Sequence, residues 1–284
     1  STCTLSQMVT VNGDMLVTGI EGTMTDIQAT SKMETETRRH FYVKKGKLVL
    51  KYVKLTFGKA KSELKMGGGC ILVLHQSRFE VSSSVFEKCQ AEEHTGAAIY
   101  TNGGIVVVKD TLFDSCISTK AASYGGAVRI DGGELNVTGS TFLKNEMKAS
   151  DGGGGGGAIY IGSSSSSSQR EGIAHIDSTL FKENKAQKGA GIYIDGQSKV
   201  TFGDGNSIFQ GNVATDGASN SINKHSDSQL YFEICRPGTF QSLNYTGTVT
   251  IDNDFSGCEK ECPEGKTAFG YDPRKSSEEE PKFC

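Results

Sequence analysis

The chain has 284 residues, a formal net charge of −3 and 22% charged side chains. A surface built to hold nucleic acid is usually strongly basic, so this charge balance argues against nucleic acid as a partner. No apolar run approaches the roughly 18 to 20 residues that a membrane-spanning helix requires.

The first part of the chain is irregular in its lettering. Residues 1–46 are rich in Thr and Met and carry the repeat motifs described below only poorly. Short alternating pieces, such as Met8-Val-Thr-Val11 and Met15-Leu-Val17, predict short strands. Terminal repeats of a solenoid are expected to be atypical because they close the open end of the core. We therefore assign residues 1–46 to an N-terminal cap with irregular first coils.

A glycine motif organises residues 47–225. Its copies are Gly68-Gly-Cys-Ile-Leu-Val73, Gly96-Ala-Ala-Ile-Tyr-Thr101, Gly125-Gly-Ala-Val-Arg-Ile130, Gly156-Gly-Ala-Ile-Tyr-Ile161 and Gly189-Ala-Gly-Ile-Tyr-Ile194. Their third residues, at positions 70, 98, 127, 158 and 191, follow one another at steps of 28, 29, 31 and 33 residues. The last four residues of each copy alternate in the manner of a strand, which places every second side chain on one face.

A phenylalanine motif shares this period. Its copies are Phe57-Gly-Lys-Ala60, Phe86-Glu-Lys-Cys89, Phe113-Asp-Ser-Cys116, Phe142-Leu-Lys-Asn145, Phe181-Lys-Glu-Asn184 and Phe209-Gln-Gly-Asn212. Two interleaved motifs with one period indicate a repeated structural unit. No window shows a convincing helical period, so we expect an all-β fold, a parallel β-helix in which each coil takes about 30 residues. The Gly-rich and Ser-rich runs at 152–157 and 163–168 then form loops that leave one coil.

The composition changes in residues 226–284. All four prolines and four of the eight cysteines (Cys235, Cys258, Cys262 and Cys284) lie there. Proline donates no hydrogen bond to a strand ladder, so its absence from residues 1–236 suits a continuously paired solenoid. We expect a last distorted coil followed by a short disulfide-rich tail. Zinc is the competing use of Cys258 and Cys262, but no second Cys-x-x-Cys or paired histidines accompany them, so no metal is predicted.

The two motifs together resemble a known repeat. Gly125-Gly126-Ala127-Val128 and the pairing of Phe142 with Asn145 are similar to the repeats of the chlamydial polymorphic outer-membrane proteins, and to repeats in large surface proteins of unicellular eukaryotes. The resemblance covers roughly residues 40–215. It implies a right-handed parallel β-helix at a cell surface, with an adhesive or structural role. No autotransporter barrel follows the repeats, and Cys89 and Cys116 replace the motif asparagine, so bacterial outer-membrane anchoring is not implied.

The repeat predicts contacts between successive coils. Equivalent residues stack at the strand spacing of ~4.8 Å, so Asn145, Asn184 and Asn212 should form a ladder of side-chain amides. Cys89 and Cys116 occupy the same position one coil apart, within reach of a disulfide, and two buried thiols are the alternative. Cys3 with Cys70 is a second expected pair, which would pin the first coils.

An outward column on the glycine-motif strands is the candidate binding surface. If Ile99 and Thr101 point inward, the outward side chains include Tyr100, Arg129, Tyr160 and Tyr193. A flat stripe of aromatic rings and Arg suits sugar stacking or a protein partner. The alternative is that tyrosine is simply a good strand residue on a solvated face.

Catalysis is weighed because β-helices also cleave polysaccharides, which needs paired carboxylates or an acidic, basic and Ca²⁺-binding set. Arg129/Asp131 and His175/Asp177 come closest, but they lie on different strands of the coil and neither recurs on the next coil. We therefore expect no catalytic residues, no cofactor and no enzyme, with a polysaccharide-binding or polysaccharide-cleaving β-helix as the alternative.

The expected setting is extracellular. An even number of cysteines and the sequons at Asn136 and Asn244 favour a secreted glycoprotein. The chain starts at Ser1, which leaves open a signal peptide already removed or a fragment of a longer protein. We expect a structural or adhesive module of a cell surface, coat or filamentous appendage. Its expected partners are other protein subunits, of the same or another chain, and possibly glycans.

Overall fold

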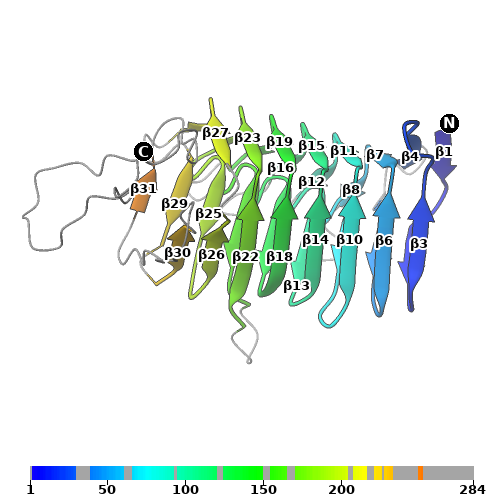
Figure 1. Ribbon diagram of the computed structural model, residues 1–284, viewed down its shortest axis with the longest axis horizontal. Coiled ribbons are helices and arrows are strands. Elements are labelled where there is room, and N and C mark those ends of the chain that lie inside the picture. Colours follow the sequence, from blue (N-terminus) through cyan, green and yellow to red (C-terminus); the bar gives the residue numbers. More distant parts are fainter. Residues whose placement is uncertain are drawn as a thin grey trace, which may run out of the picture.

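The computed structural model is a rod of stacked coils (Figure 1). It describes residues 2–29, 39–60, 66–92, 95–119, 124–149, 154–164, 170–203, 207–215, 221–225, 227–232 and 249–251. These residues form strands and turns, with no helix among them, and so none that could cross a membrane. The all-β parallel β-helix expected from the double motif is confirmed.

Four ladders of strands run along the rod, and two of them carry the motifs. The phenylalanine sheet contains β1 (Thr2–Leu5), β4 (Thr25–Ala29), β7 (Val53–Thr56), β11 (Val85–Glu87), β15 (Leu112–Asp114), β19 (Thr141–Leu143), β23 (Leu180–Lys182) and β27 (Ile208–Gln210). The glycine-motif sheet contains β2 (Val9–Val11), β5 (Phe41–Val43), β9 (Ile71–Val73), β13 (Ile99–Asn102), β17 (Val128–Asp131), β21 (Ile159–Gly162), β25 (Ile192–Ile194), β29 (Ile222–Lys224) and β31 (Val249–Ile251).

The other two ladders complete each coil. The long-strand sheet contains β3 (Met15–Thr18), β6 (Lys47–Lys51), β10 (Arg78–Ser82), β14 (Ile105–Lys109), β18 (Gly133–Thr138), β22 (Gly172–Asp177), β26 (Lys199–Phe202) and β30 (Gln229–Phe232). The short sheet contains β8 (Lys59–Ala60), β12 (Gln90–Glu92), β16 (Ile117–Thr119), β20 (Glu146–Met147), β24 (Lys185–Ala186) and β28 (Val213–Ala214).

The ends of the described stack differ from the sequence expectation. Residues 2–29 are more regular than the predicted cap, because β2 and β3 pair in parallel with β5 and β6 in the same register as the later coils. At the other end β31 pairs with β29 in the antiparallel sense, which breaks the parallel pattern. The tail cysteines Cys235, Cys258, Cys262 and Cys284, and Asn244, lie outside the described residues.

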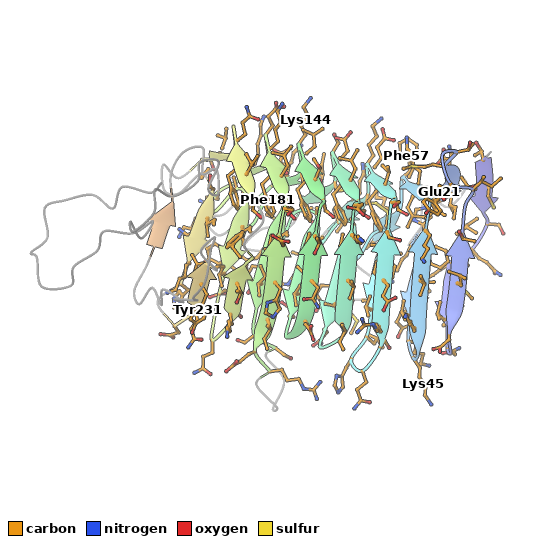
Figure 2. The ribbon with its side chains drawn as sticks, in the orientation of Figure 1. Glu21, Lys45, Phe57, Lys144, Phe181 and Tyr231 are labelled. Carbon is orange, nitrogen blue, oxygen red and sulfur yellow. A yellow bond between two sulfur atoms is a disulfide. The ribbon has the colours of Figure 1, made fainter. Side chains whose placement is uncertain are left out.

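The core is a column of stacked rings. Phe86, Phe113, Phe142, Phe181 and Phe209 are all fully buried, with neighbouring ring centroids 4.6 to 5.1 Å apart and planes within 6° of parallel. Figure 2 places Phe181 inside the coil. The alternating apolar residues of the long strands close the core from the other side.

The first copy of the phenylalanine motif was misplaced by two residues. Phe86 lies opposite Leu55, not Phe57, so Leu55 is the core residue of that coil. Phe57 instead has a φ of 60° and is 48% exposed. It starts a column of left-handed corner residues that continues through Lys88, Ser115, Lys144, Glu183 and Gly211. Each coil turns sharply there. The left-handed conformation is unfavourable for a non-glycine residue, and the hydrogen bonds of the neighbouring strands offset that cost.

An asparagine ladder follows the last three of these corners, as predicted. Asn184 Oδ1 accepts hydrogen bonds from the backbone N–H and the side-chain Nδ2 of Asn145, both 3.0 Å long. Asn212 holds Asn184 in the same way, at 3.0 and 2.9 Å. Each asparagine Nδ2 also donates to the carbonyl of the phenylalanine one coil earlier: Asn145 to Phe113, Asn184 to Phe142 and Asn212 to Phe181.

A second ladder was missed by the sequence reasoning. A Ser or Thr hydroxyl two residues before each core phenylalanine accepts a backbone N–H from the coil before it or donates to a carbonyl two residues back. These residues are Ser84, Thr111, Ser140, Thr179 and Ser207. The signal was present, since the position repeats with the same period as the phenylalanine. The two ladders together satisfy buried backbone groups at both corners of the coil.

The disulfide differs from both predicted pairs. Cys89 is bonded to Cys70, with Cα atoms 5.8 Å apart, whereas Cys116 is a buried free thiol and Cys3 an exposed one. Cys89 and Cys116 do lie one coil apart in the same register. Cys70, however, holds the third place of the glycine motif, which faces the Cys89 position across the interior of the coil. The bond therefore crosses one coil rather than linking two.

Cys116 takes the place of an asparagine in the ladder. Its thiol contacts the carbonyl of Phe86 at 3.7 Å, just as the asparagines contact the preceding phenylalanine, and its own backbone N–H is held by Asn145 Oδ1 at 3.0 Å. Burial raises the pKa of this thiol to about 12, so it stays protonated and able to donate. The alternative in which the thiol replaces asparagine thus holds for Cys116.

Candidate functional site

The predicted outward column exists on the glycine-motif sheet. Tyr100 of β13 lies opposite Arg129 of β17, Arg129 opposite Tyr160 of β21, and Tyr160 opposite Tyr193 of β25. Leu72 of β9 continues the column on the other side of Tyr100. Because the inward neighbours in these strands are buried aliphatic residues and Thr101, the alternation of each strand turns the column away from the core.

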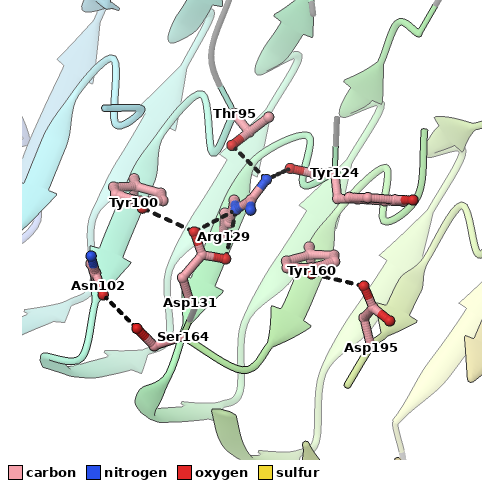
Figure 3. Close-up of polar contacts among 9 residues, drawn as sticks. All are labelled: Thr95, Tyr100, Asn102, Tyr124, Arg129, Asp131, Tyr160, Ser164 and Asp195. Carbon is pink, nitrogen blue, oxygen red and sulfur yellow. Dashed lines mark hydrogen bonds and ion pairs between the residues drawn. The ribbon is translucent and has the colours of Figure 1, made fainter. Parts of the chain in front are cut away.

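Arg129 is the centre of the polar contacts (Figure 3). Its Nε donates to both carboxylate oxygens of Asp131, at 2.8 and 2.9 Å. Its Nη1 donates to the hydroxyl of Thr95 at 3.1 Å and to the carbonyl of Tyr124 at 3.3 Å. The Asp131 carboxylate also accepts the hydroxyl of Tyr100 at 2.9 Å. Arg129 therefore links β13, β17 and two of the loops that lie outside the sheet.

The tyrosine rings pack against one another. Tyr124 stacks on Tyr160 and on Tyr193 with centroid distances of 5.1 Å to each, and the guanidinium carbon of Arg129 lies 4.7 Å from the centroid of Tyr160. The Tyr160 hydroxyl donates to Asp195 at 3.1 Å. We call these residues the tyrosine cluster: Tyr100, Tyr124, Arg129, Asp131, Tyr160, Tyr193 and Asp195.

The expectation of a flat solvent-facing stripe is wrong for Tyr160 and Tyr193, which are covered, whereas Tyr100 and Arg129 are half-buried. Tyr160 is 5% exposed and Tyr193 is 7% exposed. Loops between the short sheet and the glycine-motif sheet lie over them and form their own parallel bridges, from Tyr124 to Gly155 and from Gly155 to Lys188. Gly155 is required there, because a Cβ atom on it would lie 2.6 Å from the ring of Tyr193. The rings of Tyr160 and Tyr193 pack against neighbouring side chains and are not free for a sugar.

The electrostatics of the cluster favour fixed hydrogen bonds over proton transfer. Burial raises the pKa of both Tyr100 and Tyr160, and the nearby carboxylates Asp131 and Asp195 add to that effect. Burial is the largest effect on Arg129 and works against its charge, but Asp131, Tyr160 and Tyr100 together outweigh it, so the pKa of Arg129 is raised. The tyrosines remain neutral donors and Arg129 remains charged at every ordinary pH. The cluster therefore ties the covering loops to the sheet.

The other candidates for chemistry are not brought together. Arg129 and Asp131 lie on β17 of the glycine-motif sheet, whereas His175 and Asp177 lie on β22 of the long-strand sheet. In the part of the chain that the structure describes, no group of three or more His, Cys, Asp or Glu side chains could hold a metal ion. The sequon residue Asn136 lies half-buried on β18, where its amide donates to Glu134 at 2.6 Å.

Arg39 and His40 were not singled out for the core by the sequence reasoning, yet both are buried. Arg39 donates to the carbonyls of Gly67 and Gly68 at 2.7 and 2.6 Å, and burial lowers its pKa to about 10. His40 is fully buried and its Nε2 donates to the carbonyl of Ile27 at 3.0 Å. The sequence indicates their burial only through the repeat, because His40 aligns with Cys70 and with the alanines of the glycine motif.

His40 should make the stability of the protein depend on pH. Burial lowers its pKa from 6.5 to about 4, against the smaller raising effect of the Ile27 carbonyl. As the pH falls, His40 is therefore protonated in the unfolded chain at a higher pH than in the folded protein. The free energy of unfolding should be at its full value above pH 6.5 and should decrease between pH 6.5 and about pH 4. The loss in unfolding free energy should be on the order of 3 kcal/mol.

Urea denaturation at pH 7 and pH 5 measures this effect. The variant His40→Gln keeps a donor for the Ile27 carbonyl and removes the titration, so the difference between the two pH values should shrink. The matched variant His175→Gln removes an exposed histidine and should leave the difference as it is in the unaltered protein. An unchanged difference in His40→Gln would show that other groups cause the pH dependence.

No family model, no curated protein and no solved structure matches this chain significantly. The likeness to the chlamydial repeats rests on the two motifs alone.

Proposed function

We propose that this chain is a non-enzymatic structural or adhesive module of an extracellular surface, coat or filamentous appendage. The observation that carries the proposal is the uninterrupted column of stacked rings and asparagine amides through successive coils. Such a column makes the coils a stiff rod, in which each coil is held by its neighbours. A stiff rod sets distances between other components, which is the task of a structural module.

Two further observations support this setting. The Cys70–Cys89 disulfide favours an oxidising compartment, because such bonds are rare where the thiol pools are reduced. The polar residues of the tyrosine cluster bond one another and hold loops in place, so their arrangement suits scaffolding better than the acid–base set of a polysaccharide-cleaving enzyme. Asn136 and Asn244 as carriers of glycans remain part of the proposal.

The partners that we propose are other protein subunits. Within the described residues, β1, β2 and β3 each have a neighbouring strand on one side only. An open strand edge pairs readily with a further strand, whether that strand comes from the same chain or from another. Leu16 on β3 is 63% exposed and Ile20, which follows that strand, is 72% exposed, so apolar surface accompanies the edge.

Sedimentation of the purified protein at increasing concentration tests the proposal. We expect association that grows with concentration, and weaker association of the variant Leu16→Lys, which places a charge beside the open edge. Phe57→Lys is the matched control, because Phe57 is also an exposed apolar residue, at 48%, but follows β7, which has a neighbouring strand on both sides. A protein that stays monomeric at high concentration, with no complex recovered from its native source, would contradict the assembly role.

A further inference from the structure

Three consecutive turns enclose an open groove on one edge of the rod. The turns join the glycine-motif sheet to the long-strand sheet, and Figure 2 shows Lys45 extending from this edge. The groove has a volume of about 890 Å³ and is lined by Asn12, Gly13, Asp14, Lys44, Lys45, Gly46, His75, Gln76 and Ser77. None of these side chains is a large apolar one, so the groove does not suit an apolar ligand.

The groove carries positive charge. Lys44 and Lys45 are exposed, and neither forms an ion pair with any of the residues that the structure describes. Arg170 extends the charge, because its Nη1 contacts Nδ1 of His75 from a turn three coils further along the rod. Two glycine turns leave room for it: a Cβ atom on Gly103 or Gly132 would lie 3.1 Å from an atom of Arg170.

The acidic groups near the groove are already engaged. Asp14 Oδ1 accepts the backbone N–H of Lys47 at 3.1 Å. Glu80 forms ion pairs with Lys47 at 2.8 Å and with Arg78 at 2.6 Å. Asp14 keeps its negative charge in the groove, but Lys44, Lys45 and the neighbouring Arg170 outnumber it, so an anion that enters the groove meets a net positive charge.

We propose that this groove binds an acidic polysaccharide through its carboxylate or sulfate groups. The lining of the groove comes from three successive coils, which repeat at ~4.8 Å, close to the length of one sugar residue in an extended chain, and the middle turn carries Lys44 and Lys45. Asn12, Gln76 and the turn backbone offer donors and acceptors for hydroxyl groups between the acidic ones. An acidic polysaccharide would be the ligand of the adhesive module proposed above, so this inference rests on the proposed function.

Titration calorimetry at low ionic strength tests the proposal with four probes. Heparin carries sulfates, polygalacturonate carries carboxylates, dextran is neutral and polyglutamate is an acidic polypeptide. We expect heparin, polygalacturonate or both to bind, dextran not to bind, and added salt to weaken the binding because it screens exposed charges. Which of the two acidic sugars binds tells whether sulfate or carboxylate is the preferred group.

Two double variants locate the site. Lys44→Gln with Lys45→Gln should raise the dissociation constant by about tenfold or more, because it removes two charge-assisted contacts. Lys51→Gln with Lys109→Gln removes the same charge from exposed positions at the far ends of β6 and β14, and it should change the constant by less than about twofold. Circular dichroism checks that both double variants keep the strand-rich fold.

Three results would overturn the inference: no binding of either acidic sugar, equal losses in the two double variants, or binding of polyglutamate as tight as that of the sugars. Sedimentation of the same variants separates this test from the proposed function. If the protein associates but binds no acidic sugar, the proposal for the groove is wrong and the assembly role is supported. If the protein binds the sugar through Lys44 and Lys45 but stays monomeric, the assembly role is wrong and the proposal for the groove is supported.

Discussion

Replacing Phe142 with Ala is expected to lower the free energy of unfolding by about 3 to 5 kcal/mol. The Phe142 ring is fully buried between Phe113 and Phe181, with centroids 4.6 and 5.1 Å away. The substitution removes two ring contacts as well as buried apolar surface, and neighbouring coils cannot move together to fill the gap because their strands fix the spacing. The midpoint of urea denaturation, followed by circular dichroism, measures the loss.

Phe57→Ala is the matched control for this effect. Phe57 lies in a stretch whose sequence resembles that around Phe142, but it is 48% exposed at a corner of the coil, where the Lys88 ammonium lies 5.7 Å from its ring centroid. Its replacement should therefore change the unfolding free energy by less than about 1 kcal/mol. Comparable losses in the two variants would mean that Phe57, not Leu55, belongs to the core column.

Replacing Asn184 with Ala is expected to destabilise the protein by about 3 to 5 kcal/mol. The change leaves the backbone N–H and one amide hydrogen of Asn145 without their acceptor, and the carbonyl of Phe142 without its donor. Asn184 is fully buried, so water does not replace these partners in the closed coil. The same denaturation experiment measures the loss, and proteolysis of the folded state reports whether the coils next to the change open first.

Two comparisons give this prediction its contrast. Asn136→Ala removes a half-buried amide that donates to the side chain of Glu134 on the same strand, so it should cost no more than about 0.5 kcal/mol. Asn184→Cys should cost less than Asn184→Ala, because Cys116 already shows a thiol facing the phenylalanine carbonyl in this ladder. If Asn184→Ala were as mild as Asn136→Ala, the ladder would contribute little to stability.

Side chains that repeat with the coil were predictable, because stacking at one period needs no knowledge of the third dimension. The asparagine ladder, the outward direction of Tyr100 and Arg129, and the common register of Cys89 and Cys116 all follow from two aligned motifs. The exception is instructive. Phe57 matches the motif in sequence but does not occupy the core position, because Leu55 fills the core of that coil. A single copy of the motif does not reveal a shift of two residues.

The sequence by itself determined that the chain is a parallel β-helix, which residues of the well-repeated strands face the core and which lie one coil apart, because strand alternation and repeat length are properties of the chain alone. The tertiary structure decided what meets across a coil and what covers it. It joined Cys89 to Cys70, buried His40, folded loops over Tyr160 and Tyr193, and brought Arg170 to His75. These contacts depend on where each residue lies around the coil and on the path of the loops. The repeat length specifies neither of them.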